Sequence, residues 1–320
     1  MSNAQLATSR EVLLSKIRVL NESVWEWRVT ERVLDEWIEN FRANQSLSDR
    51  EELSLVYLVS KLIFFGDREI RELLRSMYRD LFCYPIKRSI RQSLGGALDF
   101  TLIQDRFCKE LEKTRFFGVG NPSESGTHLL YFFRQENNLP KDLFESAHRI
   151  FQRTVGDNSR RLRLPQVEHY VFLDDFCASG TQAVEYSREI VEEVRNYNPN
   201  VDVSYFALFG MSDGIRHVQR ATAFSNVEAV CIFDESFRVF SPDSRVFRSL
   251  STEIDKTWLE RVCRENGEHI FPGHALGYKN GQMLLGFHHN VPDNTLPVIW
   301  GNARAGQKWT PLVRRYHKIY

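Results

Sequence analysis

The sequence has 320 residues, of which 42% are hydrophobic, and its 42 basic side chains equal its 42 acidic side chains in number. A chain of this length forms one large domain or two smaller ones, and this apolar fraction is sufficient for a buried core. The balanced charge argues against a chain-wide electrostatic contact with nucleic acid, so direct nucleic-acid binding is not indicated.

The sequence shows no membrane or export signal. No run approaches about 20 consecutive apolar residues, so no membrane contact is predicted. The stretch MSNAQLATSREVLL lacks the apolar centre of a signal peptide. Five scattered cysteines form no C-x-x-C pair, which indicates neither a disulfide framework nor a zinc cluster. We therefore expect a cytoplasmic protein.

Residues 1–95 are predicted to form a helical N-terminal region, because apolar side chains recur at helical spacing through residues 11–43. Ser48 with Glu51 three residues later is a capping box, which predicts the start of a helix. Gly66 is predicted to end that helix.

Residues 67–82, DREIRELLRSMYRDLF, are predicted to form an amphipathic helix. Its apolar face is expected to pack on the rest of the protein, and its other face is rich in arginine. Nearby acids favour an ordinary solvated face, and the alternative is a docking surface for an acidic protein partner. The apolar positions are Ile70, Leu73, Leu74, Met77 and Leu81, and the arginines are Arg68, Arg71, Arg75 and Arg79.

Residues 96–240 are predicted to form an α/β core, because strand-like and helix-like segments alternate after Gly95-Gly96. A short strand, a polar loop at 118–128 and a helix from near Gly126 come first. Strands at 169–174, 201–210 and 226–236 follow, with a helix at 182–196 between the first two. This order predicts a mostly parallel sheet with both faces covered.

The segment HYVFLDDFCASGTQAVEY, residues 169–186, combines an apolar strand with two acids and a small-residue turn. Ligands of open parallel sheets bind beyond the carboxyl ends of the strands, where Asp174 and Asp175 are predicted to lie. Small residues and the next helix N-terminus favour a phosphate, and the hydroxyls of Ser179 and Thr181 add hydrogen-bond donors. Two carboxylates beside a phosphate cradle suit a sugar phosphate. The lysine of an ordinary phosphate loop is absent here.

The stretch VFLDDFCASGT resembles the phosphoribosyl pyrophosphate (PRPP) loop of type I phosphoribosyltransferases. The resemblance implies that Asp174 and Asp175 contact the ribose hydroxyls, and Asp175 is the nearest candidate for a catalytic base. It also implies that the 5′-phosphate is lined by Phe176, Cys177, Ala178, Ser179, Gly180 and Thr181. Gln182 stands where these enzymes usually carry a hydroxyl residue.

The loop GVGNPSESGTH, residues 118–128, falls where such enzymes bind pyrophosphate. It contains no lysine or arginine, so pyrophosphate would depend on Mg²⁺ and on arginines elsewhere. The segment NSRRLRLP, residues 158–165, is predicted to be a mobile flap that supplies them, and the alternative is an exposed basic loop. The loop residues are Gly120, Asn121, Ser123, Ser125 and Gly126, and the flap residues are Arg160, Arg161 and Arg163.

Residues 241–320 are predicted to form a C-terminal hood that holds the acceptor base, as the resemblance implies. Residues 276–315 suggest two short strands around a polar turn, and a purely structural turn is an equal alternative. No metal is assigned to His288 and His289, because neighbouring side chains on a strand point to opposite faces. The acceptor candidates are Asn290, Asp293, Asn294 and Trp300, with His288, His289 and Trp309 nearby.

The whole chain also resembles a narrower group of phosphoribosyltransferase-like proteins from bacterial conflict and antiphage systems, some of which accompany retrons. The segments DREIRELLRSMYRDLF, FFGVGNPSESGTHLLYFFRQEN, LDDFCASGTQ and HHNVPDNTLPVIW carry this resemblance. It implies an enzyme that binds PRPP and transfers or releases its phosphoribosyl group with loss of pyrophosphate. One alternative is a non-catalytic sensor of PRPP or a related nucleotide, which engages a protein partner through the N-terminal helices. Another is a toxin that modifies a macromolecule.

Overall fold

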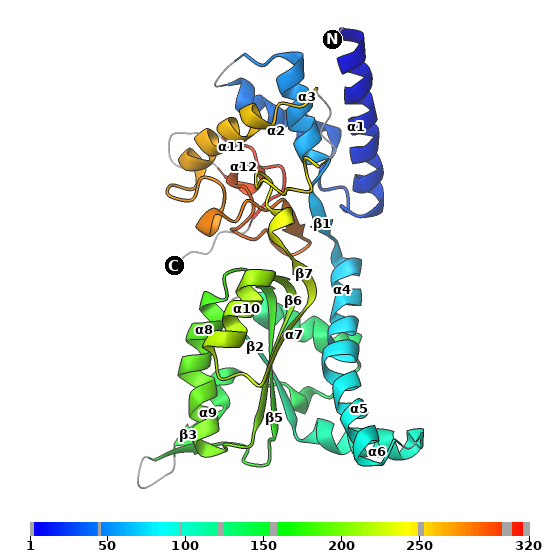
Figure 1. Cartoon of the computed structure of the whole chain (residues 1–320), viewed down its shortest axis with the longest axis vertical. Coiled ribbons are helices and arrows are strands. Elements are labelled where there is room, and N and C mark those ends of the chain that lie inside the picture. The colour runs from blue at the N-terminus through cyan, green and yellow to red at the C-terminus, as the bar shows by residue number, and fades with distance from the viewer. Residues whose placement is uncertain are drawn as a thin grey trace. The chain divides into compact units, whose positions relative to one another are not determined.

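The computed structural model describes residues 3–43, 46–96, 98–120, 125–153, 159–248, 253–302 and 309–315. The chain divides into two compact units (Figure 1). Residues 71–233 form the central unit, and residues 1–70 and 234–320 together form the terminal unit. In the part of the chain that is described, no helix is both long and apolar enough to cross a bilayer.

The central unit contains a four-stranded sheet of order β2-β5-β6-β7, in which every pair of neighbouring strands is parallel. The predicted α/β class with a parallel sheet is therefore confirmed. The strands are β2 (Thr114–Gly118), β5 (His169–Cys177), β6 (Asp202–Met211) and β7 (Asn226–Phe233). A separate antiparallel hairpin pairs β3 (Phe151–Arg153) with β4 (Arg160–Leu162).

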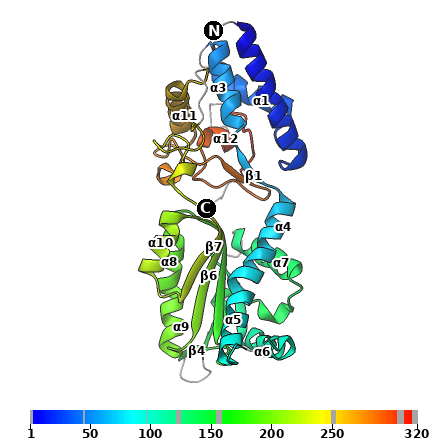
Figure 2. The same ribbon diagram turned by 45° about the vertical axis from the view of Figure 1, so that its right-hand side comes forward.

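Helices cover both faces of this sheet (Figure 1 and Figure 2). On one face Phe172 and Tyr205 pack against a continuous helical run and the helix that follows β6. On the other face Phe116 contacts Phe82 and Phe133, with ring centroids 5.2 and 5.3 Å apart. The first face is covered by α8 (Thr181–Tyr186), η4 (Ser187–Val191), α9 (Glu192–Tyr197) and α10 (Ser212–Ala221), and the second by α4 (Asp67–Ser76), η1 (Met77–Cys83) and α7 (Ser125–Glu136). The helices α5 (Tyr84–Ser93) and α6 (Phe100–Glu112) pack on each other and precede β2.

The terminal unit joins the N-terminal helices to the C-terminal segment in one hydrophobic core. Trp37 and Leu55 from the first segment are fully buried with Leu259 and Val298 from the second, and the Trp37 indole donates to the Val298 carbonyl at 2.6 Å. The unit contains α1 (Asn3–Ser23), α2 (Glu31–Arg42), α3 (Asp49–Val59), β1 (Ile63–Phe65), α11 (Lys256–Ile270), β8 (Leu285–Phe287) and α12 (Pro297–Trp300). This arrangement differs from the three predicted segments 1–95, 96–240 and 241–320, because the first and last share a core.

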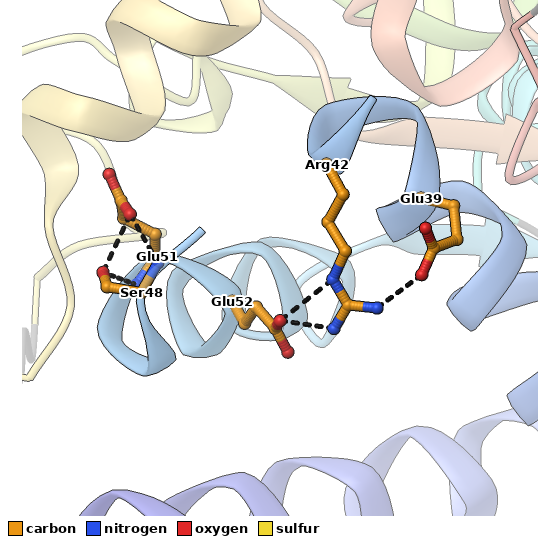
Figure 3. A network of polar contacts seen from close by, with 5 residues as sticks. All are labelled: Glu39, Arg42, Ser48, Glu51 and Glu52. Carbon is orange, nitrogen blue, oxygen red and sulfur yellow. Dashed lines mark hydrogen bonds and ion pairs between the residues drawn. The ribbon is translucent and has the colours of Figure 1, made fainter. Parts of the chain in front are cut away.

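The start of α3 is held as the sequence predicts (Figure 3). The Ser48 hydroxyl accepts from the backbone N–H of Glu51, whose carboxylate accepts from the Ser48 backbone at 2.8 Å. Arg42 at the end of α2 bridges Glu39 and Glu52, which ties α2 to α3. These local contacts cap the start of α3 and join the end of α2 to it.

The prediction that this helix ends near Gly66 is wrong, because α3 ends at Val59. Residues Ile63–Phe65 instead form β1, which pairs in parallel with β8 at Leu285–Phe287. The Ile63 N–H donates to the Leu284 carbonyl at 3.0 Å, so a partner more than 200 residues away overrides the local helical pattern.

Candidate functional site

Strand β5 brings the acid pair to the carboxyl end of the sheet, but it does not end at Asp174. It continues through Cys177 and pairs with β6 from His169↔Asp202 to Cys177↔Gly210. The expected loop over residues 174–181 is therefore shortened to residues 178–180 between β5 and α8. The acids are strand residues, so their backbone is fixed by the sheet.

Asp174 is buried at 8% exposure and is held by a tyrosine of the neighbouring strand. The hydroxyl of Tyr205, itself fully buried, donates to Asp174 Oδ2 at 2.6 Å, and the Asp175 N–H donates to Oδ1 at 2.9 Å. Burial and the charge of Asp175 raise the pKa of Asp174 to about 7. Asp174 thus carries a proton far more readily than an ordinary carboxyl.

Asp175 is partly exposed, whereas Cys177 is buried beside Tyr205. Burial, with the charge of Asp174, raises the pKa of the Cys177 thiol to about 12, so it is not a reactive thiolate. Of the residues predicted to line a 5′-phosphate, the Cys177 side chain faces the interior. Phe176, Ala178, Ser179 and Thr181 are partly exposed.

The turn after β5 is held by close backbone packing on α10. Gly180 has φ 74°, and a Cβ there would lie 2.6 Å from a Val218 methyl and 2.9 Å from the Gly214 carbonyl oxygen. A Cβ on Gly214 would lie 2.1 Å from the Ala178 carbonyl oxygen. Both positions therefore require glycine for the protein's own packing. The hydroxyls of Ser179 and Thr181 lie 3.0 Å apart at the start of the helical run.

The first loop leaves the sheet directly beside the acids. Gly118 at the end of β2 pairs with Leu173, and the Val119 N–H donates to the Leu173 carbonyl at 2.9 Å. Gly120 follows with φ 93°, which favours glycine. Ser125 and Gly126 begin α7, but their side-chain surroundings lie outside the described residues, as do Asn121 and Ser123 altogether. The structure thus brings the start of the predicted pyrophosphate loop next to Asp174.

A cavity of about 470 Å³ lies next to the end of β2 in the central unit. It is lined by Gly118, Gly120 and residues of η4 and 144–149. Tyr186 lines it, and the buried hydroxyl of this residue has no hydrogen-bond partner among the described residues. Glu189 also lines the cavity, and Ser146 Oγ lies 2.8 Å from His148 Nδ1 at its wall. The cavity therefore has both the volume and the polar groups to bind a ligand.

Two of the three arginines predicted to close over the pyrophosphate loop are paired with carboxylates of the central unit. Arg160 pairs with Glu193 at 2.8 Å, and its carbonyl accepts from the Tyr197 hydroxyl at 2.6 Å. Glu193 lies 12 residues after Thr181 in one helical run, which corresponds to about 18 Å. Arg161 is exposed on β4. Arg163 is paired with Glu145, which lines the cavity.

The predicted acceptor residues lie in the terminal unit, where their polar groups have protein partners. Trp300 is buried and its indole donates to the Thr295 carbonyl at 2.8 Å, while Asn294 donates to the Tyr278 carbonyl at 3.1 Å. Asp293 accepts from Arg315, and Asn290 accepts from the Val291 N–H. These contacts are those of a structural turn, which is the alternative that the sequence left open for this segment. Nearby, Trp309 donates to the Val298 carbonyl, His288 lies 2.6 Å from Glu26, and His289 stacks on Phe287.

A second group of titratable residues lies at the opposite end of β5. Ligand atoms of Glu110, Glu168 and His169 lie within 4.8 Å of one another, but Glu168 is paired with Lys113 at 2.9 Å. His169 Nε2 lies 3.1 Å from Glu110, and its Nδ1 lies 3.8 Å from Asp202. Burial alone would lower the pKa of His169, but Asp202 and Glu110 outweigh it and raise the pKa. The two carboxylates therefore favour the protonated form of His169.

The arginine face of the 67–82 helix is largely engaged within the central unit. Glu136 on α7, with 11% side-chain exposure, accepts from Arg71 at 2.7 Å and from Arg75 at 2.6 Å. Arg71 also lies over the Phe132 ring, and Arg79 pairs with Asp80. On the apolar face Leu74 and Met77 are fully buried, while Leu73 and Leu81 are partly buried. These contacts match the interpretation of an ordinary paired face.

The family model described as PRTase-CE matches residues 34–315. A search of curated proteins finds no match.

Solved structures that match include the Helicobacter pylori xanthine-guanine-hypoxanthine phosphoribosyltransferase, with 8% identity, coverage of 53% of this chain and 88% of that one, and a TM-score of 0.28. The AQ2163 protein from Aquifex aeolicus matches with 12% identity, 64% and 86% coverage and a TM-score of 0.29. Orotate phosphoribosyltransferase from Aeropyrum pernix matches with 12% identity, 41% and 73% coverage and a TM-score of 0.24.

Proposed function

Because the chain belongs to the PRTase-CE family, we propose that it binds PRPP at the carboxyl end of β5 and transfers or releases the phosphoribosyl group with loss of pyrophosphate. The observation that carries the proposal is the acid pair on β5, which is followed within six residues by a glycine-held turn and a helix start. A sugar phosphate requires acceptors for its hydroxyls beside donors for its phosphate, and this strand end supplies both.

The two acids have different roles in this proposal. Asp175 is partly exposed and accepts a hydrogen bond from a ribose hydroxyl. Asp174 is held by Tyr205 and supports the geometry of its neighbour from within the sheet. The backbone N–H groups of residues 178–181, with the hydroxyls of Ser179 and Thr181, hold the 5′-phosphate. Catalysis then rests on positioning, as the bond from the anomeric carbon to pyrophosphate breaks and a bond to an acceptor or water forms.

Mg²⁺ fits this donor set only in part. It prefers oxygen ligands and usually keeps several waters, binding through one or two carboxylates and substrate phosphates. Asp174 is occupied by Tyr205, so Asp175 is the carboxylate of the pair that would face the hydrated ion. The ion would supply charge neutralisation for the leaving pyrophosphate, while the residues of the turn bind and orient the sugar phosphate.

The cavity beside Gly118 and Gly120 is our candidate for the acceptor or the pyrophosphate. Its volume of about 470 Å³ suits a base-sized group, and its lining includes the polar side chains of Ser146, His148 and Glu189. This position shares the first loop with the proposed PRPP site. A ligand in this cavity needs no polar group from the terminal unit, where Trp300 and Asn294 already donate hydrogen bonds to backbone carbonyls.

A second candidate is a non-catalytic sensor that binds PRPP or a related nucleotide. It is favoured by the lack of lysine and arginine in residues 169–187 and by the proton-holding Asp174. The likeness of four segments to antiphage proteins supports a role in a bacterial defence system, with partner proteins reached through the N-terminal helices. The cytoplasm, where PRPP is available, is the expected location.

Pyrophosphate release from PRPP and Mg²⁺ with a panel of bases separates the two candidates. The enzyme hypothesis expects turnover that Asp175→Asn lowers, and the sensor hypothesis expects PRPP binding by calorimetry without turnover. Charged hydrogen bonds contribute about 1.5–3 kcal/mol, so Asp175→Asn should weaken PRPP binding about ten- to a hundredfold. If neither the wild type nor the variant binds PRPP at millimolar concentration, the site assignment is wrong.

A further inference from the structure

The terminal unit contains a second cavity, of about 300 Å³, which no part of the proposed function uses. It is lined by α1 (Lys16), by the segment between α3 and β1 (Lys61), by Arg245, and by Leu62, Met283 and Leu284. Three cationic side chains therefore share one cavity with an aliphatic surface. Its size is at the lower end of the range for small-molecule sites.

None of the three cations has a carboxylate partner within ion-pair distance among the residues that the structure describes. Lys16 donates to the Ser60 carbonyl at 2.6 Å, and Lys61 lies over the Tyr57 ring at 4.9 Å. Arg245 lies 3.6 Å from the centre of the Phe237 ring and donates to Ser236 Oγ at 3.2 Å. All of these partners are neutral.

The acid that faces this region is already engaged. Asp234 accepts from Ser236 Oγ at 2.5 Å and from the Ser236 N–H at 2.9 Å. Arg245 donates to the same serine hydroxyl, and the Ser236 hydrogen bonds together with the charge of Arg245 lower the pKa of Asp234. No aspartate or glutamate is among the described residues that line the cavity.

Lys16 is exposed and Lys61 is partly buried, and both line the same cavity. Burial and the charge of Lys61 lower the pKa of Lys16. Such a like-charge arrangement costs free energy unless a negative group binds between the cations. A phosphate has the charge and the several acceptor oxygens to contact two ammonium groups and a guanidinium together.

We propose that this cavity binds a small organic phosphate, with the phosphate held by Lys16, Lys61 and Arg245 and the apolar body on Leu62, Met283 and Leu284. The site is independent of the PRPP site proposed for the central unit, since all of its lining residues belong to the terminal unit. A neutral ligand lacks the ionic contacts with the three cations, and inorganic phosphate lacks an apolar body to contact the aliphatic surface.

Phenyl phosphate is the probe for the test, with inorganic phosphate, benzoate and benzyl alcohol as comparison ligands, in titrations of the full chain followed by NMR. We expect phenyl phosphate to bind more tightly than each of the other three. Lys16→Met and Lys61→Met should each weaken its binding about tenfold, because each removes one charged hydrogen bond and keeps an apolar stem.

Lys256→Met is the matched control. Lys256 also belongs to the terminal unit, donates to a carbonyl, that of Ser241, at 3.3 Å, and lies over an aromatic ring, that of Phe247, at 5.4 Å. It does not line the cavity. Its replacement should leave phenyl phosphate binding unchanged.

Tryptophan fluorescence melting checks that each variant keeps the terminal unit folded. Unchanged binding in both Lys16→Met and Lys61→Met, an equal loss in Lys256→Met, or no binding of phenyl phosphate to the wild type at 10 mM would each overturn the proposal. Preference for benzoate over phenyl phosphate would overturn the assignment to a phosphate. If one cavity variant does not fold, the other decides the outcome.

Discussion

Replacing Asp174 by asparagine tests whether a proton-holding carboxyl lies inside the central unit. The change keeps the size of the side chain and an oxygen to accept from the Tyr205 hydroxyl, but it removes the ionisable group. Because burial and the Asp175 charge raise the pKa, the folded protein keeps the Asp174 proton up to about pH 7, whereas the unfolded chain releases it near 3.8. Between these values the folded state binds more protons than the unfolded state.

The free energy of unfolding must therefore fall as pH rises through this window, by about 1.4 kcal/mol per pH unit. The whole interval from 3.8 to about 7 corresponds to about 4 kcal/mol. Above the folded pKa both states are ionised and the effect is constant. Asp174→Asn lacks this dependence, so its stability relative to the wild type should rise by about 2–3 kcal/mol between pH 5 and pH 8.

Urea unfolding at pH 5, 6, 7 and 8 measures this difference. All six tryptophans lie in residues 1–70 and 234–320, so their fluorescence reports the terminal unit, and circular dichroism is needed to follow the central unit as well. Asp175→Asn is the control that removes only the neighbouring charge. It should lower the pKa of Asp174, so the pH window in which stability falls should end at a lower pH. Parallel stability profiles for the wild type and Asp174→Asn from pH 5 to pH 8 would refute the reasoning.

Three further changes test the contacts of the central unit. Gly214→Ala places a methyl group against the Ala178 carbonyl, so we expect a loss of about 1–3 kcal/mol in stability and weaker PRPP binding; an unchanged melting temperature would contradict it. His169 has a raised pKa, so its stabilising charge is fully present below pH 6.5 and is lost as pH rises through the folded pKa. In urea unfolding, His169→Gln should therefore lose more stability at pH 6 than at pH 9. An equal loss at both pH values would argue against a stabilising positive charge on His169. Glu136 accepts from two arginines, which lower its pKa, so Glu136→Gln should cost about 1–3 kcal/mol at pH 7 and less once pH falls below the wild-type pKa. An unchanged melting temperature at pH 7 would show that the two ion pairs do not stabilise the fold.

The parallel core could be predicted because its signals are local. Each buried strand is an apolar run between polar turns, and the helix start at Ser48 depends on a residue only three positions away. The acid pair could also be placed near the carboxyl end of a strand, since β5 carries it in its second half.

The contacts that shape the site could not be predicted in the same way, because they join distant residues. Tyr205 meets Asp174 across 31 positions, and only the register of β5 and β6 brings them together. A tyrosine within the apolar run VDVSYFALFG is a weak signal for this contact, since a buried hydroxyl requires a partner. Trp300 is an acceptor candidate in the sequence, but the fold buries it.

The discontinuous terminal unit has a consequence for synthesis of the chain. The Tyr57 hydroxyl bonds to Val246 and the Trp37 indole bonds to Val298, partners 189 and 261 residues later. At about 5–20 residues per second, the first helices wait about 10–50 s for these partners, while the contiguous central unit can already fold. A nascent chain stalled near residue 250 should therefore have a protease-resistant central unit and cleavable N-terminal helices, whose apolar faces are meanwhile open to chaperones.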